Sequence, residues 1–234
     1  MASDSQATEQ TGQVRFEVEK LFPLTPVSVW GGSGHVEVIK GVRAALESEQ
    51  AALDASPNPD VSMQTYTGRV AKRHHDAYVQ PAATPPAPPL TSFLAAGVDN
   101  DGDPWIAEID EWNKLSTHSE RGFHAIGSGA SLAQAAVALL KHYDSADQPV
   151  RRGELVVYRV MTACVEVAAL FLGPPVKVVT VTADGAKWLT DEELDVLATD
   201  VGGWEQVEID ALDEYLALES NSDTQLDLPT DIDD

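Results

Sequence analysis

A serine between two glycines, Ser128, has the setting that most suggests chemistry. Residues 122–126 before it are short and apolar and predict a strand, and the residues after it place apolar side chains at helical spacing as far as Tyr143. Ser131, followed three residues later by Gln134, predicts a capping-box start for that helix. The chain therefore passes from strand to helix through a glycine turn that carries a hydroxyl at its tip. By itself, such a turn is either a structural corner or the support of a reacting group.

Other side chains that could react or bind metals stand in less favourable patterns. His74, His75 and Asp76 are consecutive, and consecutive side chains of one helix point about 100° apart, which argues against a shared metal ion. His124 is expected to be a packed side chain in the strand before Ser128. The single cysteine, Cys164, lies in an apolar helical run and is expected to be a buried, inert thiol.

Residues 99–103 offer several carboxylate and amide oxygens, as a calcium loop does. Their glycine falls fourth instead of sixth, however, and Asp110 stands where such a loop needs a glutamate. The stretch is better interpreted as the turn of a β-hairpin. The sequence also contains neither a phosphate-binding loop nor a serine-hydrolase elbow. We therefore expect no metal and no cofactor.

The charge of the chain is strongly acidic and unevenly distributed. The formal net charge is −23 over 234 residues, and residues 184–234 hold 17 acidic and 1 basic side chains. An acidic surface repels phosphate backbones, so we expect no binding to nucleic acid. The N-terminus is polar and no uninterrupted apolar run reaches the length of a membrane span, which predicts a cytoplasmic protein without a membrane contact.

The elements that must position these residues come in blocks. Strands are predicted over 13–20, 27–30, 91–98, 105–109 and 176–182, and helices over 35–55, 60–78, 131–143, 152–172 and 190–198. Thr190 and Glu193 form a second capping box. Residues 81–89 are rich in proline and predict an inserted surface loop, 204–218 could form an acidic helix, and 221–234 are expected to be disordered. Blocks of strands and helices joined by hairpins indicate an α+β fold with antiparallel sheets.

The order of several short motifs resembles the β-type subunits of the proteasome core and the bacterial ring threonine proteases, within the N-terminal-nucleophile (Ntn) hydrolase superfamily. The matching stretches are 1–8 (MASDSQAT), 20–24 (KLFPL), 30–34 (WGGSG), 95–99 with 108–110, and 122–129 (GFHAIGSG). The resemblance implies a four-layer α-β-β-α sandwich with two stacked antiparallel sheets. It covers about residues 1–198, which predicts one domain there and an acidic, partly disordered tail over 199–234.

In that family a threonine hydroxyl attacks a peptide carbonyl, and its own α-amine accepts the proton. The resemblance implies supporting catalytic roles for Lys20, for Asp4, which would hold the lysine, and for Ser128, which would order the amine. A nearby lysine lowers the pKa of the nucleophile, and a backbone N–H at a glycine turn stabilises the oxyanion.

The remaining family positions concern the oxyanion and the substrate. Gly34 falls at the oxyanion glycine, or Gly32 if the glycine-rich stretch shifts by two residues. Thr8 falls at the position whose backbone pairs with the substrate strand.

Two departures from the family pattern affect activity. The first strand, which bears the nucleophilic threonine, is missing from the chain as given, and residues 167–171 (VAALF) replace a D-S-x-S run that supports the amine. We therefore predict a subunit related to threonine-type peptidases whose nucleophile is absent, and whose status as an enzyme stays open. The alternatives are a non-catalytic structural subunit of the same fold and a small-amide amidohydrolase of the superfamily.

The resemblance also implies partners. Family members form rings, so we expect a homo- or hetero-oligomeric ring, with a ring ATPase as a further possible partner and peptides or proteins as substrates.

Overall fold

The central sheet consists of five antiparallel strands in the order β4-β5-β6-β7-β8. These strands are β4 (Leu21–Thr25), β5 (Ser28–Gly34), β6 (Thr91–Val98), β7 (Pro104–Ile109) and β8 (Leu115–Thr117). Because side chains alternate along a strand, Leu21 and Val29 face the second sheet while Phe22 and Trp30 face a layer of helices. The computed structural model describes residues 1–8, 15–74, 76, 91–140 and 150–222.

The second sheet has the order β1-β9-β10, and a separate two-stranded ribbon pairs β2 with β3. Their bounds are β1 (Ala2–Ser3), β9 (Lys177–Thr182), β10 (Gly185–Trp188), β2 (Gln6–Thr8) and β3 (Arg15–Glu17). Leu21 and Val29 from the first sheet and Val179 from the second form a buried cluster. The two sheets are therefore stacked face to face around a shared core.

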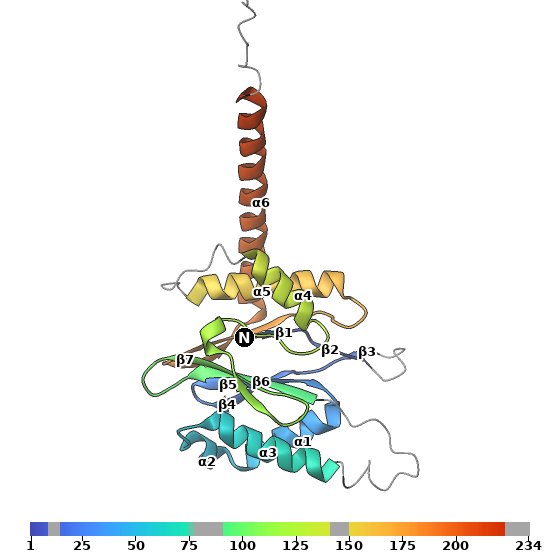
Figure 1. The fold of residues 1–234 in the computed structure, drawn as a ribbon, viewed down its shortest axis with the longest axis vertical. Helices are drawn as coiled ribbons and strands as arrows, with labels where there is room; N and C mark the ends of the chain where they lie inside the picture. The colour runs from blue at the N-terminus through green and yellow to red at the C-terminus, as the bar shows by residue number, and fades with distance from the viewer. Residues whose placement is uncertain (9–14, 75, 77–90, 141–149, 223–234) are drawn as a thin grey trace, which may run out of the picture.

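Three helices, α1 (Val36–Ser48), α2 (Gln50–Asp54) and α3 (Pro59–His74), cover the outer face of the five-stranded sheet (Figure 1). Val38, Val42 and Leu46 recur at helical spacing along α1, and all three are buried against that sheet. Trp30 is the largest fully buried side chain, and its ring centroid lies 4.7 Å from that of Phe22. Aromatic and aliphatic packing thus fixes this layer on the sheet that carries the site.

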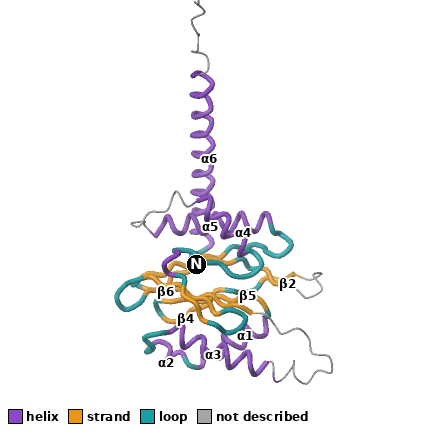
Figure 2. The backbone as a smooth tube through the Cα atoms, in the orientation of Figure 1, coloured by secondary structure: helices purple, strands orange, loops and turns teal. Residues whose placement is uncertain are grey.

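Two helices, α4 (Ala130–Leu140) and α5 (Val150–Val167), form the fourth layer, on the other side of the molecule (Figure 2). The α-β-β-α order predicted from the sequence is confirmed. The first half of helix α6 (Asp191–Ser222) lies against α5, and the two terminal guanidinium nitrogens of Arg159 donate to the Glu208 carboxylate at 3.0 and 2.7 Å. Beyond this contact α6 projects away from the body (Figure 1). Among the described residues, no helix has the length and apolar character that crossing a bilayer requires.

The expected strand over residues 122–126 is wrong. A short 3-10 turn, Ser119–Arg121, ends at Gly122 in the left-handed region (φ 65°), and the chain then runs without regular structure to α4. A strand needs a free sheet edge beside it, whereas Phe123 and Ala125 pack against the α4–α5 layer. We call residues 122–129 the crossing segment. The capping box at Ser131 is also wrong, because α4 already begins at Ala130.

Several helix boundaries differ from the prediction. The helix expected over 35–55 is interrupted at Glu49, and the one expected over 152–172 ends at Val167. The short helix and the acidic helix predicted after Thr190 are one continuous helix, because the glycine pair Gly202–Gly203 does not interrupt the run of helix-forming residues around it. The boundary predicted at residue 198 thus falls inside α6. The proline-rich loop and most of the disordered tail predicted from the sequence lie outside the described residues.

Candidate functional site

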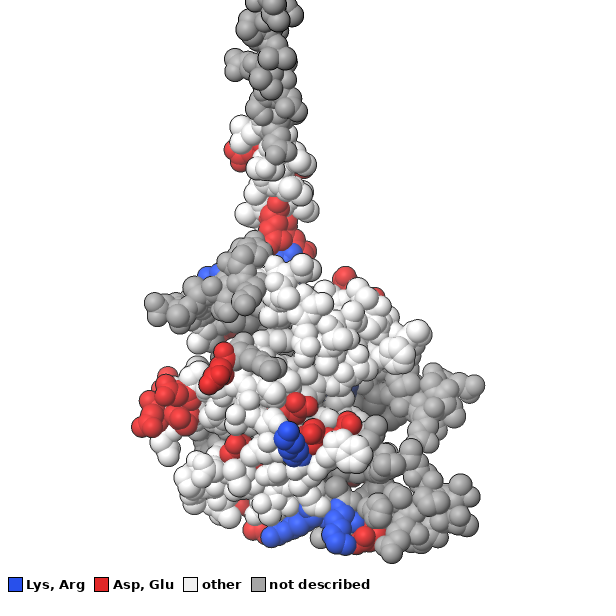
Figure 3. Space-filling model, in the orientation of Figure 1, with Lys and Arg blue, Asp and Glu red and all other residues white. Residues whose placement is uncertain are grey.

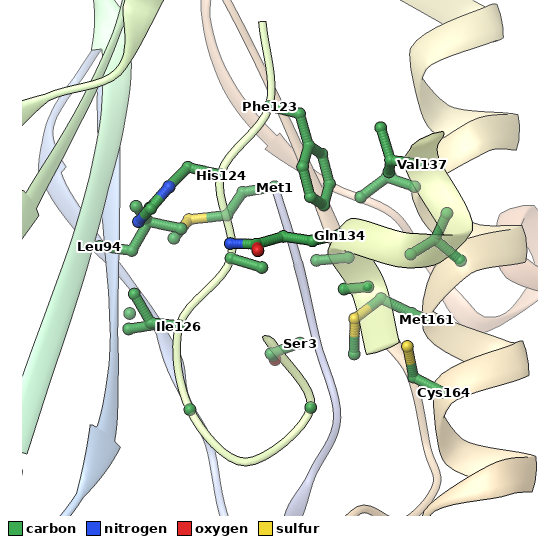
Figure 4. A pocket seen from close by; sticks show the side chains of 18 of the residues that line it. Met1, Ser3, Leu94, Phe123, His124, Ile126, Gln134, Val137, Met161 and Cys164 are labelled. Atoms are coloured by element: carbon green, nitrogen blue, oxygen red, sulfur yellow. The ribbon is translucent and has the colours of Figure 1, made fainter. Parts of the chain in front are cut away.

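A cavity of about 600 Å³ lies between the sheets and the α4–α5 layer. Its wall is formed by the start of the chain, the middle of β5, the crossing segment and the inner faces of α4 and α5. Figure 4 shows Phe123 and His124 of the crossing segment, Gln134 of α4, and Met161 and Cys164 of α5 around it. Most of the labelled side chains are apolar, so the few polar groups in the wall determine what it can bind.

Among the described residues, Lys20 and Asp4 form the one ion pair whose two members both line this cavity, with Nζ 2.7 Å from Oδ1. The Asp4 side chain is 7% exposed and that of Lys20 21%. The other carboxylate oxygen of Asp4 accepts hydrogen bonds from the backbone N–H of Gln6 at 3.1 Å and of Gly173 at 3.3 Å. Asp4 lies between β1 and β2, where it is buried. Asp4 thus fixes a positively charged group at the cavity wall.

The glycines of β5 bring backbone close to the cavity. Gly31 and Gly32 line it and are buried, and a Cβ on Gly31 would lie 2.9 Å from the Lys20 carbonyl oxygen. Gly34 ends β5 with a φ of 120°, is exposed, and is not among the residues that line the cavity. The strand predicted over 27–30 therefore continues to Gly34. Of the two glycines predicted for the oxyanion position, Gly32 and Gly34, it is Gly32 that lines the cavity.

Ser128 lies on the exposed part of the crossing segment and contributes to the cavity wall. Gly127 before it has a φ of 86°, which favours glycine, and a Cβ there would clash with the Ser33 hydroxyl. The glycine turn therefore lets the crossing segment approach β5. Thr8 lies in β2, where its backbone pairs with Arg15 of β3, and its role in binding substrate stays a prediction.

Strand β1 is an edge strand, and its free edge faces away from β9. The Met1 amine donates to the Val179 carbonyl at 2.7 Å, and the Val179 N–H donates back to the Met1 carbonyl at 2.9 Å. In an antiparallel ladder the neighbouring residue then directs its N–H and C=O to the opposite side, so those of Ala2 face the free edge. Burial lowers the pKa of the Met1 amine to about 6.

Four further residues line the cavity without a predicted role. Ser3 and Ser33 lie within the matched stretches 1–8 and 30–34, and only helical periodicity could have indicated that Met161 and Cys164 face inward. Cys164 is buried as expected, and burial raises the pKa of its thiol, which disfavours the nucleophilic thiolate.

The fold is an Ntn-hydrolase-like α-β-β-α sandwich. The chain is similar to Anbu (ancestral beta-subunit) from Yersinia bercovieri, with 14% identity, a TM-score of 0.68 and 90% of each chain covered. It is also similar to the Anbu protein in the helical assembly of the Anbu complex from Pseudomonas aeruginosa, with 14% identity, a TM-score of 0.66, and coverage of 91% of this chain and 90% of that one. No family model matches the sequence, and a search of curated proteins finds no match.

These comparisons correct the family expected from the sequence. The similar structures are Anbu proteins, which are proteasome-like but form a distinct family, so the assignment to proteasome β-type subunits or bacterial ring threonine proteases is wrong. The short motifs behind it coincide with features of the architecture: a lysine directly before β4, glycines in β5 and a glycine turn before α4. Motifs of that kind identify the fold, and at 14% identity the likeness shows the fold alone.

Proposed function

We propose that the chain is an assembling subunit whose cavity binds an extended peptide beside the Lys20–Asp4 pair. The observation that carries this proposal is the position of the pair: a fixed ammonium group in the wall of an apolar cavity, next to the free edge of β1. An ammonium group attracts carbonyl and carboxylate oxygens, and an apolar wall accepts side chains. Together these features suit a ligand with a polar backbone and apolar side chains.

The free edge of β1 supplies the second recognition element. An extended chain laid along it would exchange hydrogen bonds with Ala2, which is how peptides add as strands to exposed sheet edges. Because β1 pairs with β9 through its other side, such binding leaves the existing sheet intact. Main-chain pairing of this kind supplies affinity, and the cavity selects among side chains.

Peptide binding is tested by fluorescence anisotropy with a library of labelled peptides. Lys20→Met removes the ammonium group and Ala2→Pro removes the N–H that faces the free edge, and each is expected to weaken binding about tenfold or more. Lys177→Met is the matched control, since Lys177 pairs with Asp191 outside the cavity wall. Equal affinities for all four proteins would refute this proposal.

Hydrolysis is the second candidate function, and the buried contacts of the Lys20–Asp4 pair favour it. A fixed ammonium group lowers the pKa of a neighbouring nucleophile, which makes attack on an amide carbonyl easier. The reaction requires a Thr, Ser or Cys beside Lys20, on a strand added to the β1 edge. The in-frame DNA upstream of the Met1 codon would show whether such a residue is encoded, and hydrolysis of fluorogenic peptides that Lys20→Ala abolishes would support the activity.

Helix α6 supports the proposal of assembly. Its projecting part exposes large apolar side chains, and Ile209, Leu212 and Leu216 recur at helical spacing, each more than half exposed. Figure 3 shows uncharged atoms over much of this part of the helix. If a second copy of the chain packs its own α6 against Ile209, Leu212 and Leu216, the exposed apolar side chains of both helices become buried. A ring ATPase partner and the number of subunits stay predictions.

Assembly is tested by light scattering on the eluting protein. Leu212→Glu with Leu216→Glu is expected to reduce the particle mass, because the charges cannot be buried between helices. Val61→Glu makes the same kind of change at an exposed residue of α3 and serves as the control. An unchanged mass in the α6 variant would exclude this helix as the assembly surface.

A further inference from the structure

Two histidines and a glutamate meet beside the cavity, outside the Lys20–Asp4 pair. Glu108 lies in β7, His118 follows β8, and His124 belongs to the crossing segment. Oε2 of Glu108 is 2.8 Å from Nε2 of His124 and 3.3 Å from Nε2 of His118. All three side chains are largely buried, with exposures of 23%, 10% and 13% for Glu108, His124 and His118. We call these three residues the His–Glu cluster.

The fold holds this cluster by backbone contacts. Strand β8 returns along β7, with Ser116 opposite Glu108, and the His118 N–H then donates to the Ile106 carbonyl at 2.8 Å. The Ile106 N–H in turn donates to the Ser119 hydroxyl at 3.1 Å. His118 is therefore fixed beside β7, and the three nitrogen and oxygen atoms lie within 4.8 Å of one another.

The hydrogen bonding of the cluster is incomplete. Nε2 of His118 is buried and has no hydrogen-bond partner among the described residues, although it lies close to Glu108. A buried polar nitrogen without a partner costs free energy, and a bound ion or water is a usual reason for one. This atom is aimed at the same carboxylate oxygen that His124 contacts.

We propose that Glu108, His118 and His124 bind a divalent transition-metal ion, with Zn²⁺ as the preferred ion. Two imidazole nitrogens and one carboxylate oxygen are a donor set that Zn²⁺ takes in proteins. Tetrahedral Zn²⁺ with bonds of about 2.0–2.2 Å keeps its ligand atoms about 3.4 Å apart. The separation between Glu108 and His118 already matches, and that between Glu108 and His124 needs to widen by about half an ångström.

The two imidazole rings must also tilt. They are stacked with centroids 3.7 Å apart and planes 5° apart, so their lone pairs run parallel and do not converge. Rotation of each ring about its terminal side-chain bond aims both nitrogens at one ion, and this rotation is soft. His124 lines the cavity (Figure 4), so a fourth ligand such as water can reach the ion from there. The ion would tie the crossing segment to β7 and thereby fix one wall of the cavity.

Isothermal titration calorimetry with ZnCl₂ on the metal-stripped full chain tests the proposal. We expect one Zn²⁺ per chain with a micromolar or tighter Kd. Glu108→Gln, His118→Gln and His124→Gln are each expected to weaken binding about tenfold or more. Glu111→Gln makes the same change at an exposed turn residue, and His74→Gln removes an imidazole from the adjacent pair His74 and His75. Both controls are expected to bind as the parent chain does.

A readout on the unmodified protein keeps the test valid if a cluster variant fails to fold. X-ray absorption at the zinc edge is expected to show scattering from two imidazoles. The proposal is overturned if the parent chain takes up no Zn²⁺, if the spectrum lacks two imidazole ligands, or if His74→Gln removes the binding and folded cluster variants retain it.

Discussion

Replacing Asp4 with alanine should destabilise the protein more than any change to its partner. The Asp4 carboxylate is 7% exposed and accepts hydrogen bonds from Lys20 and from the backbone N–H groups of Gln6 and Gly173. Removing one member of a buried ion pair costs about 3–5 kcal/mol. The Lys20 side chain is 21% exposed, so water can hydrate part of its charge after Asp4 is removed. This reduces the expected cost of Asp4→Ala to about 2–4 kcal/mol. For a chain of this size that corresponds to a fall in Tm of about 5–15 °C.

The comparison with Lys20→Met makes the prediction specific. Methionine keeps most of the aliphatic side chain, and Asp4 keeps its two backbone donors, so we expect a cost of about 1–2 kcal/mol. Urea unfolding followed by circular dichroism measures both variants, and Asp101→Ala, at an exposed turn position, should change stability by about 0.5 kcal/mol or less. A cost below about 1 kcal/mol for Asp4→Ala, or equal costs for the two variants, would refute the reasoning.

Three further predictions concern other parts of the molecule. Thr190→Ala should cost about 1 kcal/mol in urea unfolding because it removes the N-cap of α6, whereas Thr199→Ala in the exposed middle of α6 should cost less than half of that. The Cys164 thiol, whose pKa is raised by burial, should react slowly with a disulfide reagent in the native protein and quickly in denaturant, and equal rates would contradict its buried position. In a chain that begins at Met1, the amine pKa falls from 8.0 unfolded to about 6 folded, so the unfolded state binds more protons between these values. The amine's contribution to the free energy of unfolding should therefore decrease by about 2 kcal/mol between pH 8 and pH 6, and acetylation of the amine should remove this contribution.

Local patterns in the sequence predicted much of the fold correctly. Alternating apolar residues around an Asp-Gly turn predicted the hairpin that β6 and β7 form, and a β-branched run predicted β9. The capping box at the start of α6 is confirmed by reciprocal hydrogen bonds between Thr190 and Glu193. These features depend on neighbours within a few residues, so the sequence contains the interactions that form them.

Features that depend on a distant partner were predicted less well. The apolar residues 122–126 suit a strand, but a strand requires a free edge, and this segment meets the α4–α5 layer instead. The motifs around Lys20 predicted that it would lie near Asp4, and the structure brings them to 2.7 Å, while their catalytic role stays a prediction. Which glycine of β5 meets the cavity was left open between Gly32 and Gly34, because strand register is set by pairing with β6.

The sequence by itself determined the α+β class and the blocks of elements, because periodicity and turn residues reflect local geometry. The resemblance of its short motifs to a known family pointed to Lys20 and Asp4 as a pair. Only the tertiary structure decided where the crossing segment runs and what gathers around it. Glu108, His118 and His124 are separated along the chain, no motif links the three of them, and His124 was expected only to pack. They meet because β8 returns along β7 and the crossing segment then passes the same point. Such a meeting is fixed by backbone pairing and packing between distant segments, which residue types alone do not specify.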